Sequence, residues 1–97
     1  MLPHSESIMN AYQYKENVWA ELERFGIVPQ PTTHPALIRE FLNDQYLYEI
    51  RKLKEQQVRL EREQGRQARK GYADKVVALR QKYPLLPVPL QDWLEAS

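Results

Sequence analysis

Residues 33–64 read THPALIREFLNDQYLYEIRKLKEQQVRLEREQ, and this stretch decides the fold. Its apolar residues recur at steps of three and four, which places them on a single face of a helix. The series consists of Ile38, Leu42, Tyr46, Ile50, Leu53 and Leu60, with the polar Gln57 filling the one missing step. The spacing predicts one long helix over residues 34–64.

This helix is long for so short a chain. At 1.5 Å per residue, about 30 residues extend about 45 Å, whereas a compact domain of about 100 residues has a radius of gyration of about 13 Å. From Tyr46 onward the apolar steps alternate between four and three, as in a coiled coil, over about two heptads. Asn43 and Asp44 are weak helix formers that permit a kink, but the pattern favours a single helix. We therefore expect the helix to overhang its own chain or to lie against a second copy.

The remaining segments are short and are separated by proline and glycine. Ser5 can cap the first of them, and Gly26 stands where a helix of that length would end. Gly65 and Gly71 bracket a basic stretch, and each costs about 1 kcal/mol in a helix interior relative to alanine, which favours a turn. The predicted segments are a helix over 5–25, a linker over 26–33, a turn over 65–70, a helix over 70–83 and an extended tail over 84–97.

The last helix carries an apolar stripe with the same spacing as the long helix, and Pro84 prevents its continuation. Matching stripes are expected when two antiparallel helices pack through one seam. We predict an all-α single domain over 1–97, a three-helix arrangement with a long antiparallel helical hairpin and an extended Pro-rich C-terminal strap. The side chains expected at an interface are Tyr46, Ile50, Leu53, Leu60, Tyr72, Val76, Leu79 and Trp93.

Charge is unevenly distributed, although the formal net charge is only +1. Residues 1–50 carry three basic and seven acidic side chains, residues 51–82 carry eleven basic and four acidic ones, and residues 83–97 carry two acidic ones. Such asymmetry can mark contact with an anionic partner, or it can hold two halves or two subunits together. The candidates for contact with a polyanion are Lys54, Arg59, Arg62, Arg66, Arg69 and Lys70.

Few residues point to catalysis. The chain has no cysteine, which excludes disulfides, thiolate metal sites and cysteine nucleophiles. Neither His4 nor His34 has a second ligand at the helical spacing of a metal pair. Glu49 lies beside the predicted seam and, if buried, requires a cationic partner, with Arg51 and Lys52 close by in the sequence. We therefore expect no catalytic residue, cofactor or metal. An enzyme would require a cleft formed between protomers in which Glu49, Tyr46 or His34 converge.

These observations favour a small non-catalytic helical protein that binds another protein, as a scaffold or regulatory module and as a homodimer. Nucleic-acid or other polyanion binding through residues 51–82 is the alternative, although nucleic-acid modules usually add stacking aromatics or a reading helix to the basic surface. The N-terminus lacks the pattern of a signal peptide. The longest apolar stretch, Pro84 to Leu90, is far shorter than the roughly 20 residues of a membrane span. We expect a cytoplasmic protein without membrane contact.

Overall fold

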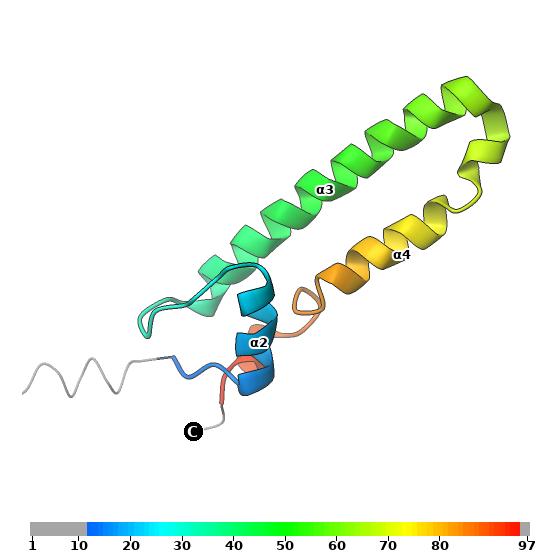
Figure 1. Cartoon of the computed structure of the whole chain (residues 1–97). Coiled ribbons are helices and arrows are strands. Elements are labelled where there is room, and N and C mark those ends of the chain that lie inside the picture. Colours follow the sequence, from blue (N-terminus) through cyan, green and yellow to red (C-terminus); the bar gives the residue numbers. More distant parts are fainter. Residues whose placement is uncertain (1–11, 96–97) are drawn as a thin grey trace, which may run out of the picture. The chain divides into compact units, whose positions relative to one another are not determined.

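A computed structural model describes residues 12–95, and the regular structure of this part of the chain is helical (Figure 1). Residues 12–95 contain no strand, and one isolated antiparallel bridge joins Tyr14 to Leu94. The all-α prediction with three α-helices is confirmed for these residues. The elements are α2 (Glu16–Arg24), α3 (Pro35–Gln64), the 3-10 helix η1 (Gly65–Arg69), α4 (Tyr72–Lys82) and the 3-10 helix η2 (Leu90–Trp93).

Two compact units make up the described chain. The first unit comprises residues 12–41 and 85–95, and the second comprises residues 42–84. The prediction of a single domain is not tested by this division and stays a prediction.

The long helix α3 contains 30 residues and continues without a break through Asn43 and Asp44 (Figure 1). The imidazole Nδ1 of His34 accepts a hydrogen bond of 3.0 Å from the backbone N–H of Ala36 and so caps the helix start. Pro35 occupies the first helical position, where its missing N–H has no consequence. The predicted long helix over 34–64 is thus confirmed, and the permitted kink does not break it.

The predicted first helix over 5–25 is wrong at residues 12–15, because α2 begins only at Glu16. The backbone before it pairs with the C-terminal segment instead: Lys15 N–H donates to the Trp93 carbonyl at 3.0 Å, and Glu95 N–H donates to the Gln13 carbonyl at 2.7 Å. These bonds hold the backbone of this segment extended, so the helix cannot begin before Glu16. Residues 5–11 lie outside the described part of the chain. The C-terminal stop is as expected, with Gly26 in the left-handed region at φ 71°.

The core of the first unit is built from side chains that are almost fully buried. They are Tyr14, Val18, Leu22, Ile38, Leu85 and Trp93. The polar ends of its buried aromatics are satisfied by backbone carbonyls, as burial requires. The Trp93 indole donates to the Val88 carbonyl at 3.1 Å, and the Tyr14 hydroxyl donates to the Thr33 carbonyl at 2.7 Å. Burial, followed by the neighbouring Tyr12, raises the pKa of Tyr14 to about 12.

The tail after α4 is not extended over its whole length. Residues 84–87 form a turn, closed by a 3.1 Å hydrogen bond from Val88 N–H to the Leu85 carbonyl, and η2 follows at Leu90–Trp93. Both Leu85 and Trp93 are buried, and these turns bring both side chains inward. The Arg39 guanidinium also donates to the Leu86 carbonyl at 3.3 Å. The strap as a whole stays a prediction.

The predicted turn over 65–70 contains the short helix η1, and glycines stand at both ends of this connection. Gly65 has φ 71° and Gly71 has φ 88°, a left-handed conformation that side chains other than glycine rarely adopt. The next helix, α4, is shorter than the predicted 70–83. It starts after the left-handed Gly71 and ends before Tyr83, whose backbone leaves the helical region ahead of Pro84. Within residues 12–95, no helix combines the length and the apolar composition needed to cross a membrane.

Candidate interaction surface

The predicted interface residues of α3 and α4 lie in the second unit, and none of them is fully buried there. We call this set the seam: Tyr46, Ile50, Leu53 and Leu60 of α3, with Tyr72, Val76 and Leu79 of α4. Every seam side chain is half-buried. Trp93 differs from the others, because it is fully buried in the first unit and has no surface left for a partner.

Glu49 is the centre of a polar cluster at one end of the seam. The Tyr83 hydroxyl donates to the Glu49 carboxylate, and the Lys82 ammonium donates to its two oxygens at 2.9 and 3.2 Å. The Tyr46 ring packs edge-on against the Tyr83 ring, with ring centroids 5.6 Å apart. The predicted need for a cation is met by Lys82, whereas the Lys52 ammonium lies 5.0 Å from the centroid of the Tyr48 ring.

The cluster shifts the titration of both hydrogen-bonded partners. Burial alone acts to raise the pKa of Glu49, but hydrogen bonds from Tyr83 and Lys82 and the charge of Lys82 outweigh it, so the pKa is lowered. Burial, and then the hydrogen bond to the Glu49 carboxylate and its charge, raise the pKa of Tyr83. Near neutral pH the cluster therefore holds an ionised carboxylate and a neutral phenol.

Gln57 fills the polar step of the α3 series and is buried, with 6% of its surface exposed. Its side-chain amide donates a 2.8 Å hydrogen bond to the Ala68 carbonyl in η1. Nearby, the Arg69 guanidinium pairs with the Glu61 carboxylate at 2.6 Å. An amide at this position satisfies a backbone acceptor of the connection, which an apolar side chain could not do.

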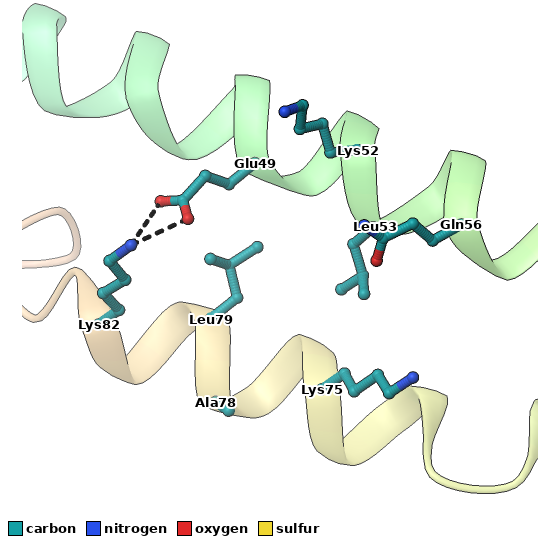
Figure 2. A pocket seen from close by; sticks show the side chains of 8 residues that line it. All are labelled: Glu49, Lys52, Leu53, Gln56, Lys75, Ala78, Leu79 and Lys82. Atoms are coloured by element: carbon teal, nitrogen blue, oxygen red, sulfur yellow. Dashed lines mark hydrogen bonds and ion pairs between the residues drawn. The ribbon is translucent and has the colours of Figure 1, made fainter.

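One flank of the seam is a groove between α3 and α4, which we call the lysine groove, with a volume of about 410 Å³. In Figure 2 the Leu53 and Leu79 side chains point into the space between the two helices, with the Glu49–Lys82 pair at one end. Its lining residues are Glu49, Lys52, Leu53, Gln56, Lys75, Ala78, Leu79 and Lys82.

A second groove, of about 480 Å³, shares no lining residue with the first, and we call it the valine groove. It is lined by Lys54, Gln57, Val58, Glu61, Arg69 and Tyr72. Helical spacing places Lys54, Val58 and Glu61 on the flank of the seam opposite to Lys52 and Gln56. Four large hydrophobic side chains of this unit are also well exposed: Leu47 at 39%, Tyr48 at 56%, Val58 at 50% and Val77 at 48%.

The six candidates for polyanion contact are all exposed. The structure does not bring all six together in one groove. Lys54 and Arg69 line the valine groove, and the Arg69 charge is matched by Glu61. The sequence reasoning did not single out Lys75 and Lys82, which line the lysine groove. Their spacing of seven residues in α4 places both on one helical face, and this spacing could have identified them.

Among residues 12–95, no group of three or more histidine, aspartate or glutamate side chains is arranged to hold a metal ion. Glu49 and Tyr46 belong to the cluster described above, and His34 caps α3. Comparison with known proteins found no family, no curated protein and no solved structure that matches this chain.

Proposed function

We propose that this protein is a small non-catalytic helical module for protein–protein interaction, with a scaffold or regulatory role, and that it acts as a homodimer. The observation that carries this proposal is the half-buried state of the whole seam in the second unit. Burial of apolar surface contributes about 25 cal/mol per Å², so a partner that covers the surface still exposed on these side chains would gain free energy.

The order of contacts along the second unit supports an antiparallel hairpin as the framework of this surface. As the residue number rises along α3, the number of its contact on the other side falls, which is the pattern of antiparallel neighbours. The contacts are Tyr46 with Tyr83, Glu49 with Lys82 and Gln57 with Ala68.

Two such hairpins would cover each other by forming a four-helix bundle. The valine groove suits a two-fold contact, because its charges are nearly balanced and exposed apolar side chains accompany it. The lysine groove does not, since its three lysines outnumber its one glutamate, and a two-fold contact would bring two grooves of the same positive charge together. We therefore assign the homodimer contact to the valine-groove side.

Light scattering coupled to size exclusion tests the dimer, and Val58→Glu is the informative variant. Val58 is half-exposed, so a carboxylate there can remain hydrated in the monomer but would be desolvated in the dimer. We expect the wild type to elute as a dimer and Val58→Glu as a folded monomer. Gln81→Glu introduces the same charge at an exposed α4 position that lines neither groove, and it should remain dimeric. A wild-type protein that stays monomeric at micromolar concentration would contradict the proposal.

Polyanion binding is the second candidate, supported by the exposure of all six basic candidates within 51–82. Phosphate contacts release counterions, so affinity for a nucleic acid would fall steeply with salt. Arg62→Glu would weaken such binding for every sequence tested. Failure of the protein to bind a polyanion column at low salt would remove this candidate.

A further inference from the structure

We propose that the lysine groove is a second binding site, which takes an acidic amphipathic helix of a partner protein. This inference rests on the proposed interaction function and names the chemistry of its partner. Amphipathic helices commonly bind by laying an apolar face into a groove between two helices. Both the floor and the rims of the lysine groove fit such an occupant.

The floor of the groove is apolar and only partly covered by the chain itself. Leu53 of α3 and Leu79 of α4 are half-buried and point into the space between the helices (Figure 2). Ala78, which also lines the groove, is small and exposed. A helix can therefore approach closely over Ala78 while its apolar residues cover the two leucines. Covering these leucines removes apolar surface from water, which is the main source of affinity in this mode of binding.

The rims of the groove are basic on both helices. Lys52 belongs to α3, and Lys75 and Lys82 belong to α4, so three ammonium groups stand against one carboxylate. That carboxylate, on Glu49, already accepts hydrogen bonds from Lys82 and Tyr83. An occupant with acidic residues on both sides of its apolar stripe would meet Lys52 on one flank and Lys75 on the other.

The spacing of the rim lysines sets the length of helix that the groove accepts. Lys75 and Lys82 are seven residues apart on α4, which is two helical turns or about 10.5 Å. An occupant of about three to four turns spans this distance. Its simplest pattern places leucine at steps of three and four, with glutamate on either side of each leucine.

The charge and the apolar floor of the groove disfavour three other occupants. A second copy of the groove would oppose lysine with lysine. The acidic helix α2 offers no apolar face, because its Val18 and Leu22 side chains are buried in the first unit. A nucleic acid would satisfy the lysines but would leave Leu53 and Leu79 without an apolar partner, since phosphate contacts do not require an apolar floor.

Fluorescence polarisation with a labelled synthetic helix of about 14 residues tests the proposal. The probe carries the leucine and glutamate pattern described above, and it is added to the full-length protein. Two control peptides keep its length: one replaces the leucines by glutamine, and the other replaces the glutamates by lysine. We expect saturable micromolar binding of the first peptide and at least about tenfold weaker binding of both controls.

Three variants of the protein locate the binding site. Lys75→Glu reverses a rim charge and should weaken binding about tenfold. Ala78→Trp fills the floor without changing any charge and should weaken binding by a similar factor. Arg62→Glu makes the same charge change as Lys75→Glu at an exposed α3 position outside the groove, and it should alter affinity less than about twofold. All three positions are exposed, and far-UV circular dichroism checks that each variant is folded.

Three outcomes would overturn the proposal. No binding of the acidic amphipathic peptide would exclude it. Arg62→Glu and Lys75→Glu could weaken peptide binding equally, and a single-stranded oligonucleotide could bind more tightly than the peptide. That result would mean that the basic residues bind a polyanion and not an acidic helix. Loss of the dimer in Ala78→Trp would assign the groove to a second copy of this chain. A wild type that is monomeric in light scattering yet binds the peptide at the groove would overturn only the homodimer, so the two failures are distinguishable.

Discussion

The Tyr83 hydroxyl donates a hydrogen bond to the carboxylate of Glu49, joining the residue that follows α4 to the middle of α3. Lys82 contacts the same carboxylate, but its side chain is half-exposed, whereas Tyr83 is buried. A buried hydrogen bond to a charged group contributes more than an exposed ion pair. Tyr83, rather than the lysine, should therefore be the main partner that holds Glu49.

Tyr83→Phe should lower the free energy of unfolding by about 1 to 2 kcal/mol, because it leaves the half-buried Glu49 carboxylate without its buried donor. Lys82→Met should lower it by less than about 1 kcal/mol. Urea unfolding followed by circular dichroism measures both changes. Adding Glu49→Gln to each variant gives the coupling energies, and a larger coupling of Glu49 to Lys82 than to Tyr83 would refute this assignment.

The lowered pKa of Glu49 predicts a loss of stability in acid. Because its pKa in the folded protein lies below the ordinary value of 4.5, the unfolded chain takes up a proton first as the pH falls. The stabilisation is therefore complete above that ordinary value and is lost as the pH falls through the folded pKa. Unfolding curves of the wild type and Glu49→Gln, measured from about pH 7 to about pH 3, should converge on acidification. A constant difference over that range would be inconsistent with the lowered pKa.

The raised pKa of Tyr14 predicts a separate loss of stability in alkali. Its pKa rises from 10.0 to about 12 on folding, so the unfolded chain releases the proton first as the pH increases. The stabilisation is complete below pH 10 and is lost as the pH rises toward about 12. Tyr14→Phe should remove this part of the alkaline decline and leave the part due to Tyr83, as measured by urea unfolding at increasing pH. An unchanged pH dependence in Tyr14→Phe would argue against the shift.

The long helix could be predicted from sequence because its determinants are local. Apolar residues at steps of three and four, Pro35 at the start and Gly65 after the end define α3 without reference to any other segment. The start of α2 could not be predicted in this way. Tyr14 and Lys15 have helical spacing to the residues after them, but their backbone pairs with residues 93 and 94, which lie about 80 residues away in the sequence. Local spacing carries no information about such distant pairing.

The candidate site was predictable in its apolar part and not in its polar part. The seam follows from periodicity, whereas the partner of Glu49 depends on which residues of α4 come opposite to it. Sequence proximity suggested Arg51 or Lys52, and the structure gives Lys82 and Tyr83. The lysine groove was not predictable for the same reason, because lysines on two helices form one site only when the helices pair.

Gln57, the polar residue in the apolar series of α3, tests whether its hydrogen bond to Ala68 stabilises the fold. Gln57→Leu keeps the side-chain size but removes the donor to the Ala68 carbonyl, which should lower the free energy of unfolding by about 1 kcal/mol. Gln56→Leu, at the adjacent exposed position, should change it by less than about 0.5 kcal/mol. Urea unfolding measures both. If Gln57→Leu were instead stabilising, the position would favour an apolar side chain, and the hydrogen bond to η1 would not contribute to the stability of the fold.

Trp93 should be the side chain on which the first unit depends most. It is fully buried, its indole donates to the Val88 carbonyl, and its own carbonyl accepts from Lys15 N–H. Trp93→Ala should therefore destabilise the protein by about 3 to 5 kcal/mol, the usual loss for removing a large aromatic ring from a core.

Trp19→Ala is the matched control, because Trp19 is half-buried and contacts Tyr14 edge-on at a centroid distance of 6.3 Å. It should cost clearly less than Trp93→Ala, since less of its surface is removed from water. Thermal and urea unfolding followed by the fluorescence of the remaining tryptophan report on the first unit in each variant. If both variants lost the same free energy of unfolding, the C-terminal segment would not anchor the unit through Trp93. The burial of Trp93 would then reflect the size of the ring alone.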